Sequence, residues 1–300
     1  MSHPDVHIGS DGWLFLIGGR NRAITQYRRN PAWWWRLRRW RKIIEARAAR
    51  CERHGITFLQ VVVPEKLTIM SDHCAAPIVD PQSAPAVRLA HLMTQSSASS
   101  RYVDLVAALS EDKEKLFLRT DPHWNYKGCH VAYQCICAAL QVSPRDDLLD
   151  RPFLEFDAPG ALGNKLTPPA TELIRVHCAI KDATRRSVNE LVTRFNERGG
   201  RGPVRGSQAI YDNPSVEADP RRLLLFGDSN CNFDPTQLTG MFAETFREVH
   251  FVWSSSLDWR HVEETKPDIL ICEIAERFLK RLVDDRFDVQ ATVAARLRKR

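Results

Sequence analysis

Two tripeptides in this chain carry residue types that could perform nucleophilic catalysis. Gly-Asp-Ser ends an apolar run at Ser229, and Asp-Pro-His occupies Asp121 to His123 earlier in the chain. Residues two apart in an extended segment project to the same side, so Asp121 can bind one imidazole nitrogen of His123 and leave the other free as a base. A serine next to such a base can attack an acyl group. These residues predict Ser229 as nucleophile, His123 as general base and Asp121 as the residue that orients the base.

The pattern of the surrounding chain predicts a sheet that could bring these residues together. Apolar runs alternate with helical patterns, and we expect strands at 56–64, 101–105, 116–120, 221–227, 248–253 and 268–274. This alternation is typical of an α/β fold, a parallel sheet with helices on both faces. Asp121 and Ser229 follow two of these strands, and the carboxyl ends of parallel strands share one edge. A helix is expected from Asp234 to Arg247, so the backbone N–H of Ser229, in a helix-like turn, is a candidate for an oxyanion hole.

Each tripeptide also has an interpretation without catalysis. Asp-x-His can be a capped loop that carries a surface histidine, and Gly-Asp-Ser can be an ordinary turn. Both lie at predicted strand ends of one sheet, and this joint placement favours a catalytic site. Glu276 and Arg277 follow the last predicted strand, and we interpret them as a structural ion pair rather than as chemistry.

Positive charge is concentrated in one predicted helix. The segment 28–53 holds ten Lys or Arg against Glu45 and Glu52, whereas the whole chain has a net charge of +6. One interpretation is a solvated face whose arginine stems cover apolar surface, and the other is contact with an anionic lipid or polyanion. The cluster Trp33–Trp35 beside the arginines keeps the second interpretation open. Because the remainder of the chain is nearly neutral, no specific nucleic-acid binding is expected.

The composition is that of a large folded domain without a membrane-spanning helix. Of 300 residues, 43% are hydrophobic, and no apolar run is long enough to cross a bilayer. The N-terminus lacks the pattern of a signal peptide, so we expect a cytoplasmic protein, or a periplasmic one if the N-terminus is incomplete. Several of the eight cysteines lie in apolar periodic segments, which suits reduced, buried thiols. Neither a metal site nor a cofactor is expected.

The domain organisation is expected to be a single α/β domain, 1–300, that is interrupted once. Residues 1–145 and 221–300 would form the core of this domain. Between them, 146–220 is rich in proline, glycine and charge, and we expect an inserted excursion with small β elements rather than sheet core. One such element is expected at 208–211.

Six stretches together resemble one protein family. In chain order they are GSDGWLFL (9–16), VVVPEKL (61–67), LRTDPHWNYKG (118–128), YDNP (211–214), LLLFGDSN (223–230) and ILICEIAER (269–277). They are similar, in this order, to the SGNH-hydrolase-like alginate O-acetyltransferases of the AlgJ and AlgX type. Each stretch is short, but together they span nearly the whole chain, so the combination is specific.

The resemblance implies a three-layer α/β/α, flavodoxin-like fold in which the Asp-x-His block precedes the Gly-Asp-Ser block. It also implies acetyl transfer to a carbohydrate hydroxyl through an acyl-enzyme on Ser229, with His123 and Asp121 as its partners. The implied partners are a carbohydrate acceptor and a protein that donates the acetyl group. Two alternatives stay open: an SGNH carbohydrate esterase or deacetylase would use the same residues, and a non-catalytic carbohydrate-binding relative would keep the fold.

Four further residues are weaker candidates for binding the substrate. Trp124 stands beside the predicted base, where its ring could stack on a sugar or pack in the core. Lys66 follows a predicted buried strand, and Asn164 lies in the predicted excursion. Asn230 occupies a position at which the family usually has an aromatic residue, so the pocket is expected to differ there.

Overall fold

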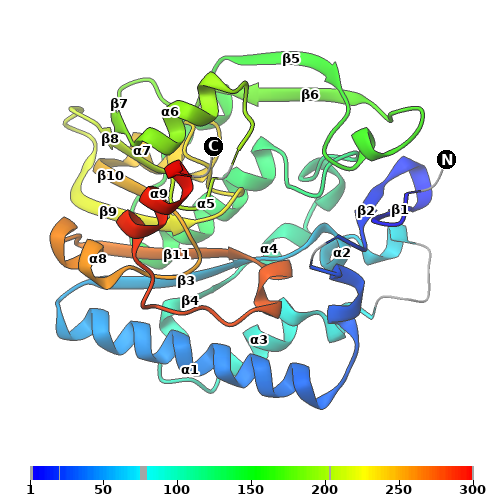
Figure 1. Ribbon diagram of the computed structural model, residues 1–300, viewed down its shortest axis with the longest axis horizontal. Helices are drawn as coiled ribbons and strands as arrows, with labels where there is room; N and C mark the ends of the chain where they lie inside the picture. Colours follow the sequence, from blue (N-terminus) through cyan, green and yellow to red (C-terminus); the bar gives the residue numbers. More distant parts are fainter. Residues whose placement is uncertain (1–2, 20, 75–79, 203, 299–300) are drawn as a thin grey trace.

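The fold is organised around one mixed, mostly parallel sheet, as the computed structural model shows (Figure 1). The structure describes residues 3–19, 21–74, 80–202 and 204–298. The sheet has the order β4-β3-β11-β9-β10-β8-β7. Its strands are β3 (Thr57–Val63), β4 (Tyr102–Asp104), β7 (Thr184–Val188), β8 (Gln208–Asp212), β9 (Asp219–Gly227), β10 (Phe246–Trp253) and β11 (Ile269–Ala275). The strands from β4 to β10 pair in parallel, whereas β8 pairs antiparallel with both β10 and β7.

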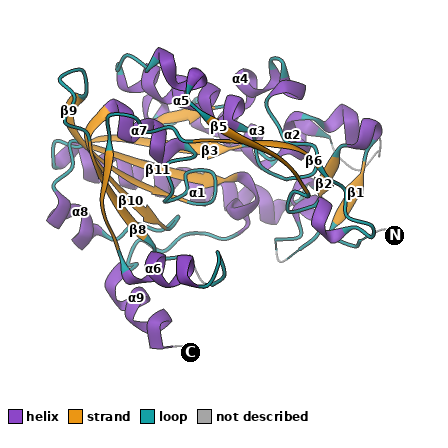
Figure 2. Cartoon of the chain, turned by 90° about the horizontal axis from the view of Figure 1, so that it is seen from above, coloured by secondary structure: helices purple, strands orange, loops and turns teal. Residues whose placement is uncertain are grey.

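Helices cover the sheet, and two small hairpins lie outside it. The helices are α1 (Pro31–Arg53), α2 (Lys66–Ile69), α3 (Pro85–Met93), α4 (Val106–Ser110), α5 (Tyr126–Leu140), α6 (Glu190–Glu197), α7 (Leu238–Thr245), α8 (Trp259–Thr265) and α9 (Val289–Arg298). The hairpins are formed by β1 (Val6–Ile8) with β2 (Leu14–Leu16), and by β5 (Phe153–Ala158) with β6 (Glu172–His177). Figure 2 shows β1 and β2 at the end of the molecule opposite to α8. Among the described residues, no helix is long and apolar enough to span a bilayer.

Alternate side chains of the central strand β9 pack into two separate hydrophobic layers. Leu223 and Leu225 pack in the layer that contains residues of α5 and α7. Leu224 and Phe226 pack in the other layer, with residues of α1 and α3. A strand buried on both faces needs a continuous apolar run, and 223–226 is such a run. The helices therefore lie on both faces of the sheet (Figure 1), and the predicted three-layer α/β/α fold is confirmed.

Helix α1 is positioned by a cap at its start and by one apolar stripe. The Asn30 side chain accepts a hydrogen bond from the backbone N–H of Trp33 at 2.9 Å, and a proline occupies the first turn. Trp40 and Ile44 of the stripe are 1% and 0% exposed, so this face is sealed against the sheet. Arg47 interrupts the pattern, because it is buried and its guanidinium bonds to carboxylate and amide groups instead of solvent.

Residues 116–120 do not form a strand of the sheet, and the prediction is wrong there. This segment makes only an isolated bridge, between Phe117 and Trp124. Lys66 and Glu172 bond the backbone polar groups of this loop, so the loop needs no strand partner. The residues Asp121 and His123 therefore lie on a loop that leads into α5, rather than at the end of a strand.

The predicted excursion contributes two strands to the main sheet. β8 pairs with β10, and β7 pairs with β8, so the sheet extends further than the sequence indicated. Ala209 and Tyr211 of β8 are fully buried, which places this strand in the core. Without β8, the edge of β10 would present unpaired N–H and C=O groups. The expectation that 146–220 lies outside the sheet core does not hold for these two strands.

Candidate active site

Ser229 stands in a tight turn directly after the central strand β9. Asp228 Oδ1 accepts hydrogen bonds from the backbone N–H of Asn230 at 3.0 Å and from the Asn230 side chain at 2.9 Å. The second carboxylate oxygen of Asp228 accepts from the N–H of Ala275 at 2.8 Å, which ties the turn to the end of β11. One carboxylate therefore fixes the backbone on both sides of Ser229.

The three residues predicted to form a triad meet at this turn. His123 Nδ1 lies 2.6 Å from Asp121 Oδ1, and His123 Nε2 lies 2.8 Å from Ser229 Oγ. An ionised carboxylate can only accept, so Nδ1 carries the proton and donates it to Asp121. In the neutral imidazole with this tautomer, Nε2 is unprotonated and accepts the hydrogen bond of the Ser229 hydroxyl. In this arrangement an imidazole can remove the hydroxyl proton.

The surroundings of Asp121 keep its carboxylate ionised. Burial alone would raise the pKa of this group, but the hydrogen bond and charge of His123 outweigh burial and lower the pKa well below its usual value. The backbone N–H groups of His123 and Ala161 also donate to the carboxylate, at 2.9 and 2.7 Å. Asp121 is therefore an ionised acceptor near neutral pH, and three hydrogen-bond donors from His123 and Ala161 hold it in one orientation.

Lys66 and Glu172 hold the loop that carries Asp121 and His123. Lys66 Nζ donates to three backbone carbonyl groups of the loop, those of Leu118 at 2.8 Å, Arg119 at 3.0 Å and Asp121 at 2.7 Å. Burial lowers the pKa of Lys66 to about 7, while the three acceptors match the three N–H groups of an ammonium. The Glu172 carboxylate accepts from the N–H of Thr120 at 2.7 Å on the other side of the loop. Lys66 therefore supports the loop and is not free to bind a substrate.

A turn from the predicted excursion closes over the same loop. The N–H groups of Leu162 and Gly163 both donate to the carbonyl oxygen of Thr120, at 3.0 and 2.9 Å. A Cβ atom at Gly160 would lie 2.6 Å from that oxygen and 2.7 Å from Asp121 Cβ. The two backbones touch at this point, so the position requires glycine.

Arg277 is a site residue that the sequence analysis assigned to a structural ion pair. Its Nη2 lies 3.2 Å from His123 Nε2 and 3.5 Å from Ser229 Oγ. Its Nη1 donates to Glu65 Oε1 at 2.8 Å, so its ion pair is with Glu65 and not with the adjacent Glu276. The prediction of an ion pair is thus correct in kind but wrong in partner, and it did not include the contact with Ser229.

The charge on Arg277 is maintained in spite of its burial. Burial disfavours the guanidinium, but nearby carboxylates, Glu65 first among them, raise its pKa overall. A positive charge therefore lies next to Ser229 Oγ, where negative charge would develop if this hydroxyl attacked an acyl group. The sequence offered one signal for this residue: it comes directly after the strand 269–275, at the sheet edge that also carries Ser229.

Glu276 is buried behind this ion pair and organises the adjacent backbone. Its carboxylate accepts hydrogen bonds from the N–H of Glu65 at 2.8 Å, the hydroxyl of Thr68 at 2.6 Å and the N–H of Ala86 at 2.9 Å. Burial raises the pKa of Glu276 to about 7, although the three donors oppose this shift. The group therefore titrates near neutral pH, in contrast to the Asp121 carboxylate.

The backbone N–H of Ser229 makes no hydrogen bond within the part of the chain that the structure describes. It stays a candidate for an oxyanion hole, as predicted. The expected helix does not start at Asp234, however, because α7 begins at Leu238. Asp234 instead forms an ion pair with Arg185 at 3.0 Å. The N-terminus of α7 is thus further along the chain from Ser229 than the sequence indicated.

The weaker substrate-binding candidates lie mostly in structural positions. Trp124 is 2% exposed, and its indole N–H donates to Gln237 at 3.1 Å, so the ring packs in the core and cannot stack on a sugar. Asn230 is also buried, and its side chain is used within the turn. Lys66 is bonded to the loop carbonyls, as described above. Asn164 is exposed, in the turn that closes over the loop, and its role stays a prediction.

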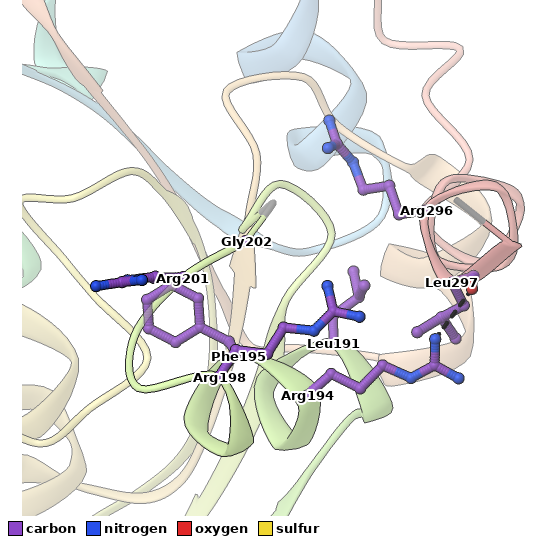
Figure 3. Close-up of a pocket in the computed structure, with 8 residues that line it drawn as sticks. All are labelled: Leu191, Arg194, Phe195, Arg198, Arg201, Gly202, Arg296 and Leu297. Carbon is purple, nitrogen blue, oxygen red and sulfur yellow. Dashed lines mark hydrogen bonds between the residues drawn. The ribbon is translucent and has the colours of Figure 1, made fainter. Parts of the chain in front are cut away.

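Two hollows of the surface differ in their distance along the chain from the predicted site residues: one is lined by the neighbour of Ser229, and the other by no residue of the site. A cleft of about 480 Å³ opens at the carboxyl ends of β9, β10 and β11, and Asp228, the neighbour of Ser229, lines it. A smaller hollow lies between α6 and α9, away from these strand ends. Figure 3 shows its basic lining, formed by Arg194, Arg198, Arg201 and Arg296.

Comparison with known proteins decides the family. The family model described as the SGNH hydrolase-like domain of the acetyltransferase AlgX matches residues 6–255. The chain belongs to this family. Among curated proteins, this AlgX-family chain is similar to the probable alginate O-acetylase AlgJ of Pseudomonas aeruginosa, with 26% identity over 160 residues. The match covers 51% of this chain but only 37% of the length of AlgJ.

Solved structures show that the AlgX-family chain shares its fold with two further proteins. The O-acetyltransferase domain of Pseudomonas putida AlgJ aligns over 98% of this chain and 99% of that domain, with a TM-score of 0.59 and 17% identity. Bacillus cereus PatB1 aligns over 90% of this chain and 95% of its own, with a TM-score of 0.60 and 14% identity. At these identities the similarity concerns the fold, and it confirms the SGNH-like architecture.

Proposed function

We propose that this AlgX-family protein is an O-acetyltransferase that moves an acetyl group to a carbohydrate hydroxyl. The observation that carries the proposal is the hydrogen-bonded series from Asp121 through His123 to Ser229, with Arg277 beside the nucleophile. Membership in a family described by an acetyltransferase supports the same class of reaction. In addition, an ionised Asp121 carboxylate is the state that the reaction needs to orient His123.

The first half-reaction would place the acetyl group on Ser229. His123 Nε2 removes the hydroxyl proton while Oγ attacks the carbonyl carbon of the acetyl donor. The carbonyl oxygen becomes an oxyanion, which the Ser229 N–H and the Arg277 guanidinium would stabilise. His123 then gives the proton to the leaving group, and the bond between that group and the acetyl carbon breaks. Asp121 stabilises the imidazolium between these two proton transfers.

The second half-reaction would pass the acetyl group to the acceptor. His123 removes the proton of a sugar hydroxyl, whose oxygen attacks the acetyl carbon and forms the new ester bond. The bond to Ser229 Oγ breaks, and Oγ takes the proton back from His123. Water in place of the sugar would give hydrolysis, so an esterase or deacetylase is the alternative function. The two differ in whether the acceptor site binds sugar and excludes water.

We further infer two partners from this chemistry. The acceptor is a carbohydrate, and the relative AlgJ, named an alginate O-acetylase, supports a polysaccharide. A partner protein would present the acetyl group to Ser229. The two half-reactions require no metal ion or cofactor of their own, and they set no limit on the chemical identity of the donor beyond an activated acetyl group.

Turnover of a chromogenic acetyl ester tests the assignment of the catalytic residues. We expect Ser229→Ala to reduce turnover by about 10³-fold or more, and Asp121→Asn by about 10³- to 10⁴-fold. Asp157→Asn, an exposed position on β5, serves as the matched control and should retain full turnover. Equal turnover by Ser229→Ala and the unmodified protein would refute the proposal.

A second assay separates transferase from esterase and from a binding protein. The protein is acetylated with the chromogenic ester in the presence of a carbohydrate acceptor, and the acceptor is examined by mass spectrometry. Acetylated sugar that disappears in Ser229→Ala supports the transferase. Ester turnover without acetylated sugar supports the esterase, and sugar binding without either activity supports a non-catalytic relative.

We also propose that the start of α1 contacts an anionic surface. Trp34 and Trp35 are 51% and 52% exposed, which is unusual for tryptophan. The guanidinium of Arg38 lies 3.7 Å from the centre of the Trp34 ring, and that of Arg39 lies 5.4 Å from the Trp35 ring. Exposed indole rings beside positive charge suit the interface of an anionic lipid bilayer.

A further inference from the structure

A pocket between the start of α1 and α3 has no part in the chemistry at Ser229. Its volume is about 460 Å³, which is within the range of sites that bind small molecules. Helices α1 and α3 pack against each other on one face of the sheet (Figure 1). We call this site the α1–α3 pocket, and the residues that line it are Arg29, Asn30, Pro31, Trp34, Gln82 and Arg88.

The lining of the α1–α3 pocket carries two arginines and no acidic residue. Arg29 forms an exposed ion pair with Asp80 at 2.8 Å, so its charge is already offset. The charge of Arg88 is not offset. Burial and the neighbouring charge of Arg29 both lower the pKa of Arg88, and no carboxylate among the described residues raises it. The pocket therefore has an uncompensated positive charge, which favours an anionic ligand.

Arg88 also has hydrogen-bond donors to offer. Its Nη1 is buried and makes no hydrogen bond within the part of the chain that the structure describes. Because buried polar groups nearly always have a partner, an unpartnered donor on the wall of a pocket indicates a ligand that accepts. A guanidinium group binds a phosphate with two parallel hydrogen bonds. The positive end of the dipole of α1, a helix of 23 residues, adds to the same wall.

Trp34 joins the α1–α3 pocket to an exposed aromatic surface. Its side chain lines the pocket and is 51% exposed, and Trp35 beside it is 52% exposed. The Arg38 guanidinium lies 3.7 Å from the centre of the Trp34 ring. In a lipid bilayer, indole rings gather at the level of the headgroups, where the phosphates also lie. A phosphate site beside such a ring therefore lies at the depth at which a headgroup would meet the protein.

We propose that the α1–α3 pocket binds the phosphate of an anionic phospholipid, with Arg88 as its principal ligand and Trp34 at the level of the headgroup. The proposal rests on the proposed contact of α1 with an anionic surface, and it adds a specific site to that contact. Since α1 directly precedes β3 in the chain, its start lies toward the carboxyl end of β3 (Figure 1). Binding at this pocket would thus place the end of the sheet that carries Ser229 near the lipid surface.

Three variants separate a specific pocket from diffuse attraction by charge. Lys42 is exposed on α1 and does not line the pocket, so Lys42→Ala measures the attraction by the helix as a whole. Arg198 lines the hollow between α6 and α9 (Figure 3), so Arg198→Ala measures the loss of one charge far from α1. Arg88→Lys keeps the charge of the pocket but loses the planar fork of donors.

Sedimentation with vesicles of phosphatidylcholine and phosphatidic acid tests the pocket, and circular dichroism checks that each variant is folded. We expect Arg88→Ala to weaken binding by about 10- to 100-fold, because two charge-assisted hydrogen bonds are lost. Arg88→Lys should weaken binding by about tenfold. Lys42→Ala should weaken it by about fivefold at most, and Arg198→Ala should leave it unchanged. Glycerol 3-phosphate, which has this headgroup without acyl chains, should compete with the vesicles only weakly.

Three outcomes would overturn the headgroup site. Equal weakening by Arg88→Ala and Lys42→Ala would show diffuse attraction and would leave the proposed surface contact of α1 in place. Binding of glycerol 3-phosphate that is as tight as that of the vesicles, and that is lost in Arg88→Ala, would show a site for a soluble phosphate instead of a lipid. Unmodified protein that does not sediment with these vesicles would remove both the site and the surface contact. The failure of the site and the failure of the surface contact are therefore distinguishable.

Discussion

Arg277 contacts both the buried Glu65 and Ser229, which we propose as the nucleophile. One end of its guanidinium group pairs with Glu65 at 2.8 Å, and the other end lies within 3.5 Å of Ser229 Oγ. The first contact keeps the group charged and fixed in place. The second contact places that charge where an oxyanion would develop. The Arg277 side chain is therefore expected to contribute both to the stability of the fold and to the reaction at Ser229. Substitutions of Arg277 and Glu65 can separate these two contributions.

At the scale of the residue, Arg277→Met should reduce both activity and stability. We expect kcat for a chromogenic acetyl ester to fall by about 10²- to 10³-fold, because the positive charge beside the oxyanion is lost. We also expect a loss of about 3 kcal/mol or more in the free energy of unfolding, because Glu65 is left as an unpaired buried charge. Steady-state kinetics and urea unfolding measure the two effects.

The double variant with Glu65→Gln and Arg277→Met serves as the control. Removing both charges should return most of the lost stability, because no unpaired ion stays buried. The kcat should stay low, since the charge next to Ser229 is still missing. A double variant that regains full kcat would show that Arg277 acts only through the stability of the fold.

At the scale of the element, the loop that carries Asp121 is held by groups from three other segments. Lys66 bonds its carbonyl groups, Glu172 bonds its N–H groups, and the turn 160–163 covers it. A loop without a strand partner thereby acquires a fixed geometry. We infer that activity depends on the position of this loop as well as on the identity of Asp121 and His123.

The substitution Gly160→Ala tests this dependence on position. The added Cβ would lie within 2.7 Å of Asp121 Cβ, so the loop must shift by a fraction of an ångström or more. We expect kcat for the acetyl ester to fall by about 10²-fold, because a displaced base no longer meets the nucleophile. As a control, Gly199→Ala introduces backbone strain at a φ of +60° but meets no atom within 4 Å. That variant should lose some stability and keep its kcat; a matching loss of kcat would contradict the account.

A second prediction at this scale concerns the pH dependence of stability through Glu276. Burial raises its pKa from 4.5 to about 7 in the folded protein. Between these values the folded chain binds a proton that the unfolded chain has lost, so the associated stability is full below pH 4.5 and is lost as pH rises through 7. A shift of this size corresponds to about 3 kcal/mol.

Urea unfolding of Glu276→Gln at several pH values between 4.5 and 8 measures this contribution. Glutamine cannot titrate, so the decline of the unfolding free energy across that range should become smaller than in the unmodified protein. Glu111→Gln, an exposed position, should leave the pH dependence unchanged. The same slope in Glu276→Gln and the unmodified protein would rule out Glu276 as its source.

At the scale of the whole molecule, the sequence predicted the centre of the sheet better than its edges. The central strands contain continuous apolar runs such as 223–226, and these runs have few alternative structures. The edge strands β7 and β8 carry charged and alternating residues, and their place in the sheet depends on β10 having a free edge. Whether β10 has a free edge cannot be read from the sequence of β7 or β8 itself. For this reason 146–220 was expected to lie outside the sheet core.

In the predicted site, too, residues that share a local motif could be identified from the sequence, whereas contacts between distant segments could not. Asp121, His123 and Ser229 could be named because their types and spacing have a chemical meaning. Arg277 was interpreted as part of a structural ion pair, because its contacts with His123 and Ser229 join segments far apart in the sequence. For Trp124 the sequence left sugar stacking and core packing both open, because the contact with Gln237 that accompanies its burial is also distant in sequence.

The basic face of α1, with its exposed tryptophans, is expected to bind the whole protein to anionic membranes. We expect sedimentation with vesicles that contain an anionic phospholipid but not with neutral vesicles, and a decrease with added salt. The double variant with Trp34→Ala and Trp35→Ala should bind about tenfold more weakly. Leu154→Ala, which removes an even more exposed apolar side chain from the β5–β6 hairpin, is the control and should bind normally. Binding that is indifferent to the tryptophans would exclude this face as the contact.

We propose that His123 activates Ser229 as a nucleophile. Reaction with a fluorophosphonate is the most direct test of this role. Such a reagent forms a covalent bond only with a serine that a neighbouring base activates. We predict one adduct, located by peptide mass spectrometry at Ser229, that is absent in Ser229→Ala and forms far more slowly in His123→Ala. A folded protein that forms no adduct at Ser229, or that labels equally without His123, would contradict the account.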